Sequence, residues 1–306
     1  MSHVVKHTPR YTRTQSIWIV VLTYIAAIAM GWAALAYLPD WPTIWRVLAA
    51  DVLATLVVWG VSFGFKNTSI YDPYWSVAPP LVVLYLTLLP EMQAASLRFW
   101  LVNAVVWFWG IRLTANWVRS WQGLHTEDWR YLSFQSKTRS WYWLMSLLSF
   151  HVFPTLTVFA GMVPLFPALL DWPGGEGYYA FHWLDFVAFL IATIGVLFEL
   201  IGDEQMHRFR HKPDRDPSEP FAKGLWAWSR HPNYFGETTF WLGIGLFGVA
   251  ANPAAYWWCL GGYVIMLGLF LAYSIPAMEK KSLEKRPKYK DVQRRVSVLF
   301  PWPPRG

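Results

Sequence analysis

The residues of this chain that could do chemistry lie in short polar segments between long apolar stretches. Glu199 and Asp203 are one helical turn apart and lead directly into the basic residues Arg208 and Arg210. Carboxylates beside guanidinium groups suit a ligand with both hydroxyl groups and phosphates, because carboxylates accept from hydroxyls and guanidiniums donate two hydrogen bonds to a phosphate. A salt-bridged helix end at a membrane surface has the same pattern, so both interpretations stay open.

A second polar segment runs from Gly224 to Glu237 and is the densest polar group in the chain. Pro232 restrains the preceding residue to an extended conformation and suits the first turn of a helix, so the segment presents polar side chains where a helix begins. Glu237 is then expected just inside a membrane, where a buried carboxylate needs a partner such as a ligand. The candidate ligand-binding side chains are Arg230, His231, Asn233, Tyr234 and Glu237.

Three further polar residues, Asp51, Asn103 and His151, lie inside apolar stretches. A polar group in a membrane interior is costly, so each of these side chains is a candidate for a functional site. Hydrogen bonding between neighbouring helices would explain them equally well.

Two other patterns resemble known sites but lack the context that those sites need. Gly243, Gly245 and Gly248 match the spacing of a dinucleotide-binding fingerprint. They lie in an apolar helix with no strand before them, so we interpret them as small residues that let two helices approach closely. His207 and His211 are four residues apart, but basic residues surround them and no cysteine is near, so we expect no metal site.

The elements that must position these residues are long apolar helices. The chain is 55% hydrophobic and 15% charged, against roughly 25% charge in ordinary soluble domains, so little water-facing surface can be built from it. Each apolar stretch can cross all or most of a hydrocarbon core of roughly 30 Å as a helix. We therefore predict an all-α, polytopic membrane bundle with about eight transmembrane helices at 17–38, 44–65, 74–89, 97–117, 141–170, 181–201, 234–250 and 255–276.

The basic residues are distributed unevenly between the two sides of this bundle. Only Arg46 and Arg98 fall on one side, and the other 24 of the 26 lysines and arginines fall on the opposite side. The positive-inside rule then predicts a multi-pass membrane protein with cytoplasmic termini and with outward loops at 39–43, 171–180 and 251–254. This topology accounts for the net charge of +7, so we expect membrane lipids as partners and no nucleic acid.

The segment from Gly224 to Glu237 closely resembles the signature of the steroid 5α-reductase-like membrane proteins, and in particular the bacterial domain-of-unknown-function family 1295 grouped with them. The resemblance runs from about Asn67 to Pro303. Further motifs follow in the expected order: Glu199-x3-Asp203, Arg208-Phe209-Arg210, Pro276-x2-Glu279, Arg286-Pro287-x-Tyr289 and Phe300-Pro301-Trp302. The resemblance implies N-terminal membrane helices at 1–66, with the first helix added to a seven-helix core, and a reductase-like membrane domain at 67–306, all in one integrated helical domain.

This resemblance implies an NADPH-dependent oxidoreductase acting on CH–CH groups. Its substrate would be a lipid-soluble small molecule, a steroid-like or other enone whose conjugated carbon–carbon double bond is reduced. The family's cofactor contacts carry over onto Asp203, Arg210, Asn233 and Glu237, with Glu199 where the reductases have a polar amide. Arg112, Arg208, Arg230, His231 and Tyr234 complete the predicted NADPH-binding residues. For Arg112, anchoring of its helix at the membrane interface is an equally good interpretation.

The catalytic acid of the reductases corresponds to Asp72, because the run from Asp72 to Pro79 aligns without a gap at the start of a helix. The chain departs from the family at Trp109, which stands where the reductases have the tyrosine that partners this acid. Tryptophan has no titratable proton to give, so we predict that Tyr74, Tyr131 or another group takes the tyrosine's role in catalysis.

Two other classes of function fit parts of the sequence. Arg230-His231-Pro232 also resembles the isoprenylcysteine and phospholipid methyltransferases, which bind S-adenosylmethionine at a similar membrane edge. Those enzymes are shorter, and Glu199-x3-Asp203 and Asn233-x3-Glu237 fit the reductase pattern better. A non-catalytic lipid-binding membrane protein is the third class. The identity of the bound ligand separates the three.

Overall fold

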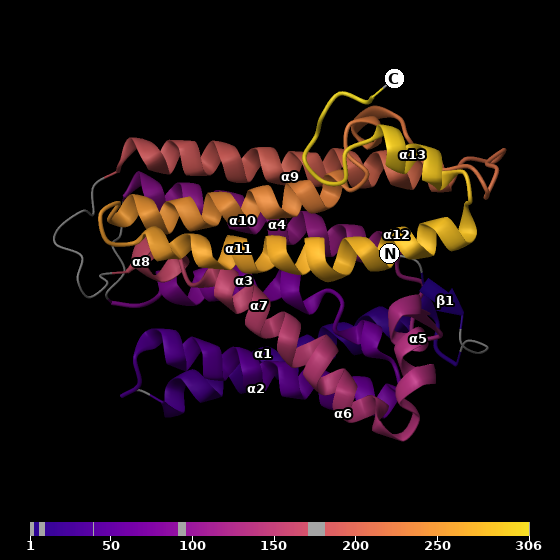
Figure 1. Cartoon of the computed structure of the whole chain (residues 1–306). Coiled ribbons are helices and arrows are strands. Elements are labelled where there is room, and N and C mark those ends of the chain that lie inside the picture. Colours follow the sequence, from indigo (N-terminus) through magenta and orange to yellow (C-terminus); the bar gives the residue numbers. More distant parts are fainter. Residues whose placement is uncertain (1–2, 6–9, 39, 91–95, 171–180, 306) are drawn as a thin grey trace. The chain divides into compact units, whose positions relative to one another are not determined.

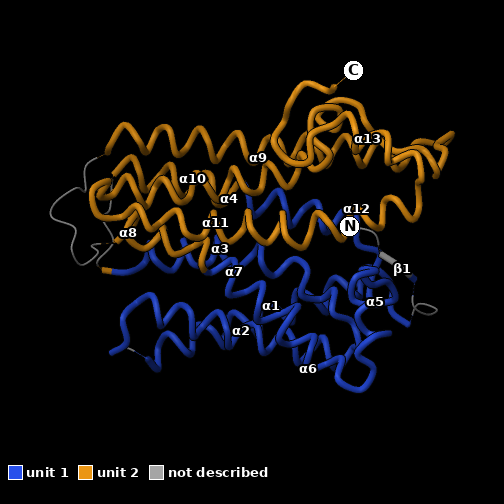
Figure 2. Tube along the Cα trace, in the orientation of Figure 1, with its two compact units in different colours: residues 1–89, 109–159 blue, residues 90–108, 160–306 orange. Residues whose placement is uncertain are grey.

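The structure, a computed structural model, describes residues 3–5, 10–38, 40–90, 96–170 and 181–305. The chain divides into two compact units, coloured separately in Figure 2. Unit 1 comprises residues 1–89 and 109–159, and unit 2 comprises residues 90–108 and 160–306. The two N-terminal helices thus belong to the same unit as a later part of the chain. The predicted outward loop at 171–180 lies outside the described residues.

Unit 1 consists of helices and one small antiparallel sheet. Its elements, with α4 and α7 shared with unit 2, are β1 (His3–Val5), α1 (Arg13–Tyr37), α2 (Thr43–Phe65), η1 (Thr68–Ile70), α3 (Tyr74–Thr87), α4 (Leu97–Ser120), β2 (Thr126–Asp128), α5 (Trp129–Thr138), η2 (Arg139–Trp141), α6 (Tyr142–Ser146), η3 (Leu147–Val152) and α7 (Phe153–Met162). In the sheet, β1 pairs antiparallel with β2, which is a small addition to the predicted all-α fold. Figure 1 shows α1 and α2 side by side.

Local sequence signals start α1 and end α2. Thr12 and Gln15 form a capping box, in which each side chain accepts a hydrogen bond from the other residue's backbone N–H, at 3.2 and 2.9 Å. The α2 helix ends at Lys66, which adopts a left-handed conformation with φ of 53°. The N–H of Asn67 then donates to the carbonyl of Ser62 at 2.9 Å and closes the helix end. The second apolar helix therefore stops at the polar segment that follows it.

Unit 2 consists of helices. After the first part of α4 and the end of α7, its elements are α8 (Leu165–Leu169), α9 (Trp183–Arg210), η4 (Gly224–Ala227), α10 (Pro232–Ala251), η5 (Trp257–Leu260), α11 (Gly261–Leu269), η6 (Phe270–Ser274), α12 (Ile275–Lys285) and α13 (Tyr289–Arg295). Figure 1 shows α9 and α10 lying side by side over much of their length.

Small residues bring α9 and α10 into close contact. A Cβ atom on Gly236 would lie 2.5 Å from the carbonyl oxygen of Gly195, and a Cβ on Gly243 would lie 2.6 Å from the Cβ of Ala192. Both distances are shorter than atoms tolerate, so these positions require glycine. The interpretation of Gly243 as a helix-contact residue is confirmed.

The prediction of an all-α membrane bundle is confirmed. Among the described residues, five stretches are long and apolar enough as helices to cross a bilayer: Arg13–Tyr37, Thr43–Phe65, Trp129–Leu169, Trp183–Arg210 and Trp257–Lys285. The other three predicted spans are helical as well, as α3, α4 and α10, but do not belong to these five. The number of eight crossings therefore stays a prediction.

Candidate functional site

Within unit 1, residues 67–69 after α2 are hydrogen-bonded to residues 124–128 before α5. Asn67 donates from its side-chain amide to the carbonyls of Leu124 and Thr126, at 2.8 and 2.9 Å. The N–H of Thr68 donates to the carboxylate of Glu127 at 2.6 Å, and the N–H of Asp128 donates to the Ser69 hydroxyl at 3.1 Å. Two polar segments that lie far apart in the sequence are thereby held together.

Asp72 and Tyr131 meet within this framework. The Tyr131 hydroxyl donates to Asp72 Oδ1 at 2.6 Å, and both side chains are buried, with exposed fractions of 7% and 3%. The second carboxylate oxygen, Asp72 Oδ2, is buried and has no hydrogen-bond partner among the described residues. A carboxylate oxygen left in this state favours the protonated acid, because a proton there removes the buried charge.

The surroundings of Asp72 raise its pKa to about 7, chiefly through burial and next through the negative charge of Asp128. The hydrogen bond from Tyr131 and the positive charge of Arg130 act in the opposite direction and are smaller. Arg130 contacts Asp128 at 2.7 Å, so part of its charge is already balanced. A carboxyl group with this pKa can hold a proton at neutral pH and release it.

Tyr74, the other predicted catalytic tyrosine, points to a different acid. Its hydroxyl donates to Asp51 Oδ1 at 2.7 Å. Trp109 is completely buried, and its ring lies 6.4 Å from that of Trp75. The structure therefore brings Tyr131, and not Tyr74, onto Asp72. Arg112, a predicted cofactor residue, is buried in unit 1 on α4, whereas the other predicted cofactor residues lie in unit 2.

The three isolated polar residues of the apolar stretches have hydrogen bonds of different kinds. Asp51 accepts from Tyr74, as above, and His151 lies within 3.4 Å of the Ser62 hydroxyl, so both connect helices of unit 1. Asn103 donates to the carbonyl of Phe99, one turn earlier in its own helix.

In unit 2, the segment 224–237 packs on the last turns of α9. The Trp226 indole donates to the carbonyl of Gly202 at 2.9 Å, and the N–H of Leu225 donates to the Gln205 side chain at 3.0 Å. An added Cβ on Gly202 would lie 3.7 Å from the backbone nitrogen of Asn233. The two polar segments that the sequence singled out therefore lie next to each other.

The predicted carboxylates of this region lie along the α9–α10 contact. Glu199 is 3% exposed, and an added Cβ on Gly236 would lie 2.6 Å from its Cγ. Glu237, which is 4% exposed, accepts from the Trp241 indole at 2.8 Å. Asp203 is half-buried one turn after Glu199. The structure therefore places Glu199 and Asp203 on α9 beside the start of α10, whereas Glu237 is buried against Trp241 of its own helix.

Three arginines form a positive cluster at the end of α9. Arg210 attracts Asp203 and is repelled by Arg215 and Arg286. Arg215 also lies over the ring of Phe209, 5.1 Å from its centre. Burial, and next the positive charge of Arg215, lower the pKa of Arg286 below its ordinary value. Such a cluster favours an anion such as a phosphate.

Arg208, another predicted cofactor residue, makes an exposed ion pair with Glu204 one turn earlier, at 2.7 Å. No pattern in the sequence indicated that Arg215 or Arg286 would bind a ligand. The tertiary structure brings both of them to Arg210. Arg286 directly follows α12 and donates to the carbonyl of Pro217, two residues after Arg215, at 2.9 Å.

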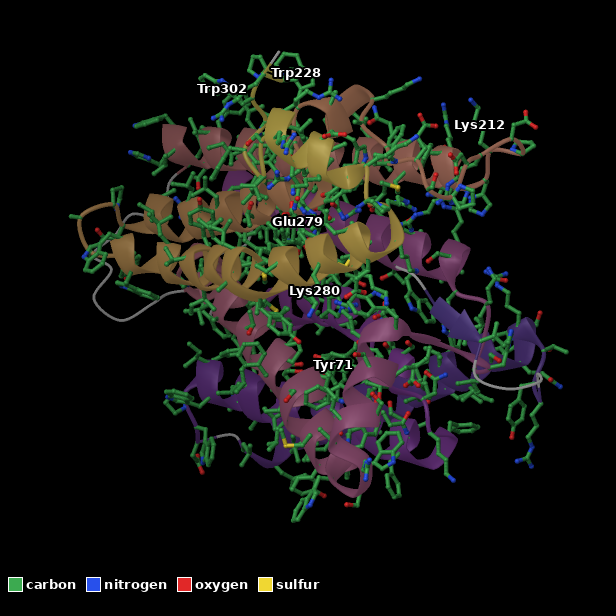
Figure 3. All side chains as sticks on the ribbon, turned by 45° about the vertical axis from the view of Figure 1, so that its right-hand side comes forward. Tyr71, Lys212, Trp228, Glu279, Lys280 and Trp302 are labelled. Atoms are coloured by element: carbon green, nitrogen blue, oxygen red, sulfur yellow. The ribbon has the colours of Figure 1, made fainter. Side chains whose placement is uncertain are left out.

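Arg230 and His231 contact Glu279, a residue of α12 that Figure 3 labels. Arg230 Nε lies 2.7 Å from Glu279 Oε1, and His231 Nε2 lies 3.3 Å from the same oxygen. Gln293 donates to Glu279 Oε2 at 2.8 Å. Glu279 therefore joins the start of α10 to α12 and α13. The sequence offered one signal for this role, since Glu279 is the first charge after a long apolar run.

The C-terminal tail adds backbone contacts to the same region. The N–H of Arg230 donates to the carbonyl of Ser297 at 2.8 Å, and the N–H of Trp302 donates to the carbonyl of Trp228 at 3.0 Å. Trp228 and Trp302 are labelled near each other in Figure 3. Tyr234 stacks on the ring of His231, 5.5 Å between centres. The tail therefore helps to hold the segment that carries Asn233 and Glu237.

The sequence model of the family described as "Protein of unknown function (DUF1295)" matches residues 58–296. The chain belongs to this family. A relative from Schizosaccharomyces pombe, itself described as uncharacterized, is 29% identical over 266 residues, which cover 80% of this chain and 76% of the relative. No solved structure matches this chain significantly. The match covers α3 to α13 and therefore includes Asp72, Tyr131 and the polar region of unit 2.

Proposed function

We propose that this protein is a membrane-embedded, NADPH-dependent reductase of a conjugated carbon–carbon double bond in a lipid-soluble enone. The buried hydrogen bond of 2.6 Å from Tyr131 to Asp72 carries the proposal. The resemblance to the steroid 5α-reductases requires a tyrosine beside the catalytic acid, and Trp109 stands at the expected position of that tyrosine. Tyr131 supports the proposal because it supplies a phenol to the acid from α5.

Asp72 and Tyr131 would act on the oxygen of the enone. Negative charge develops on a carbonyl oxygen when the conjugated double bond is reduced, and a nearby proton donor stabilises that charge. Asp72 Oδ2 is the atom that can hold the transferable proton, because Oδ1 already accepts from Tyr131. Tyr131 would keep the carboxyl group in place and stabilise the anion that remains after the proton has left.

The residues of unit 2 fit a phosphorylated dinucleotide. The mutual repulsion of Arg210, Arg215 and Arg286 would be relieved by a phosphate, and Asp203 next to Arg210 could accept from a ribose hydroxyl. Glu199 and Asn233 lie where the start of α10 packs on α9, and together with Glu237 they would bind the other polar groups of the dinucleotide. When bound, NADPH would supply the hydride for the β-carbon of the enone. Arg230 and His231 would act indirectly, by holding α10 and the tail through Glu279.

Ligand-induced stabilisation of the detergent-purified protein tests the cofactor. NADPH, NADH and S-adenosylmethionine are compared in parallel by thermal unfolding, and a ligand at a hundredfold excess over its Kd should add about 2.7 kcal/mol to the free energy of unfolding. We expect the largest stabilisation with NADPH. Stabilisation by S-adenosylmethionine alone would support a methyltransferase instead. No response to any of the three, in protein that unfolds cooperatively, would support a non-catalytic lipid-binding protein.

The membrane orientation is part of the same proposal. The distribution of lysine and arginine supports cytoplasmic termini. The resemblance to a bacterial family is the support for a bacterial inner membrane. Reporter fusions after Lys66, after Lys137 and at the C-terminus should then report the cytoplasm, and a fusion after Asn252 should report the outside. The reverse pattern at two or more of these sites would overturn the orientation.

A further inference from the structure

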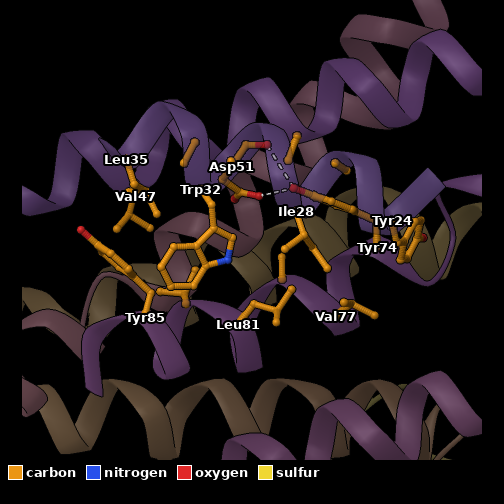
Figure 4. A pocket seen from close by; sticks show the side chains of 16 residues that line it. Tyr24, Ile28, Trp32, Leu35, Val47, Asp51, Tyr74, Val77, Leu81 and Tyr85 are labelled. Atoms are coloured by element: carbon orange, nitrogen blue, oxygen red, sulfur yellow. Dashed lines mark hydrogen bonds between the residues drawn. The ribbon is translucent and has the colours of Figure 1, made fainter. Parts of the chain in front are cut away.

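A narrow cavity lies inside unit 1 between α1, α2 and α3 (Figure 4). Its volume is about 80 Å³, and its lining residues come only from these three helices. Most of them are apolar, and small residues such as Ala27 and Ala50 make the space between α1 and α2. Trp32 is 41% exposed and closes one side, edge-on to Tyr85 with their ring centres 5.7 Å apart.

Asp51 places one acidic group in this apolar lining. Its Oδ1 accepts from Tyr74 at 2.7 Å, the contact drawn in Figure 4. Its Oδ2 has no hydrogen bond among the described residues, although the residue is only 7% exposed. A carboxylate oxygen in the apolar interior of a membrane helix is costly unless a donor reaches it, and a ligand inside the cavity could supply that donor.

The shape of the cavity restricts what can fill it. The lining residues of α1 run from Tyr24 to Leu35, a length of roughly 16 Å along a helix. The volume of about 80 Å³ is the space open to the centre of a water-sized sphere. Spread over this length it has a radius of roughly 1.3 Å, and with the sphere's own radius of about 1.4 Å the cavity has the width of one hydrocarbon chain and not of fused rings. We propose that the cavity binds a linear lipid alcohol, whose hydroxyl donates to Asp51 Oδ2 and whose chain extends toward Leu35 and Tyr85. This site does not depend on the proposed reductase activity.

Photolabelling of the full-length, detergent-purified chain tests the site. The probe is dodecanol with a photoreactive diazirine near the end of its chain, and the labelled peptides are identified by mass spectrometry. Labels are expected in 24–35 and 77–85. Unlabelled dodecanol should compete, and its methyl ether, which cannot donate a hydrogen bond, should compete roughly tenfold more weakly. Cholestanol should not compete, because its fused rings do not fit the cavity.

Two variants and a matched control locate the occupant. Asp51→Asn keeps the shape of the side chain but places an amide N–H₂ where Oδ2 was, so the preference for the alcohol over its ether should disappear. Ala27→Leu fills the cavity and should lower labelling roughly tenfold or more. Ala26→Leu adds the same atoms at the neighbouring exposed position and should leave labelling unchanged.

Several results would overturn the proposal. Labels spread over exposed helix faces without competition would show partition into detergent and no site. Equal competition by the alcohol and its ether in the wild type, or an unchanged preference in Asp51→Asn, would remove the role of Asp51. Competition by cholestanol as strong as that by dodecanol would exclude a linear-chain site. The Asp51→Asn comparison decides the matter if Ala27→Leu does not fold.

Discussion

Two carboxylates of unit 1 and two of unit 2 have partners of different kinds. In unit 1, Asp51 and Asp72 each accept a hydrogen bond from a phenol, at 2.7 Å from Tyr74 and 2.6 Å from Tyr131. In both carboxylates the second oxygen has no hydrogen bond among the described residues. A neutral phenol does not hold a carboxylate in its charged form as a cation would, so a proton or a ligand can still be accommodated there.

In unit 2 the corresponding carboxylates face guanidinium groups. Asp185 receives two hydrogen bonds from Arg98, at 2.7 and 3.0 Å, and the two side chains are 0% and 3% exposed. Glu279 lies 2.7 Å from Arg230 and also contacts His231. Carboxylates held in this way link separate segments of the unit. For these four residues, the comparison teaches that acid chemistry is to be sought at Asp51 and Asp72, whereas the ion pairs of Asp185 and Glu279 stabilise the structure.

The largest effect on stability should come from the buried ion pair of unit 2. Asp185→Ala leaves the Arg98 guanidinium buried without its carboxylate, so the free energy of unfolding should fall by about 3–5 kcal/mol. Asp72→Asn should change it by less than about 1 kcal/mol near neutral pH, because no cation is left behind. Unfolding of both variants in the same detergent measures the difference. Equal losses of unfolding free energy in the two variants would contradict this difference between the units.

The largest effect on activity should come from Asp72. Asp72→Asn keeps the size of the side chain but removes the acidic proton, so enone reduction should fall roughly a hundredfold or more while NADPH affinity is nearly preserved. Turnover and nucleotide binding are measured on the same preparation. Full turnover in this variant would show that another group protonates the substrate.

A matched pair of tyrosine variants sharpens the difference between the two phenols. Tyr131→Phe removes the hydrogen bond to Asp72 and should lower enone reduction roughly tenfold to a hundredfold. Tyr74→Phe removes the bond to Asp51 and should change it less than roughly threefold, because the structure places its hydroxyl on the other acid. The reverse order of effects would assign the catalytic phenol to Tyr74.

The arginine cluster of unit 2 should affect affinity rather than turnover. Arg210→Ala removes a guanidinium from the cluster with Arg215 and Arg286, so dinucleotide affinity should fall roughly tenfold to a hundredfold, with turnover at saturating NADPH nearly unchanged. Arg294→Ala removes only an exposed ion pair with Asp291 and is the matched control. Loss of binding in Asp72→Asn but not in Arg210→Ala would reverse the roles of the units.

The effect of pH should be the smallest of these effects. The pKa of Asp72 is raised to about 7, so the acid form needed for proton donation is lost above that pH, and turnover should fall about tenfold per pH unit there. Stability should change in the same direction. The carboxyl group of Asp72 binds its proton more tightly in the native protein than in the unfolded chain, so its contribution to stability is greatest below pH 3.8 and is lost as the pH rises to about 7 and above. Asp72→Asn should abolish both trends.

Local patterns in the sequence determined the secondary structure and the polar segments of this protein. Apolar stretches long enough to cross a bilayer form helices, because no water is present there and the backbone N–H and C=O groups must hydrogen-bond to each other. Gly243 was correctly interpreted as a helix-contact residue, since only a small residue fits where two helices touch. The family was also identified from the residues between Gly224 and Glu237, because a dense polar segment at a membrane edge carries much specific information.

Only the tertiary structure decided which side chains meet. Tyr131 and Asp72 are 59 residues apart, and nothing in the periodicity of either segment specifies that one hydrogen-bonds the other. The contact forms because Asn67 bonds across to the segment before α5 and fixes the end of α2 there. Helix periodicity acts over a few residues, whereas such contacts depend on how whole helices pack. Sequence patterns could name Tyr131 and Tyr74 as candidates and mark Glu279 as the first charge after an apolar run, but which side chain each of them contacts depends on the packing.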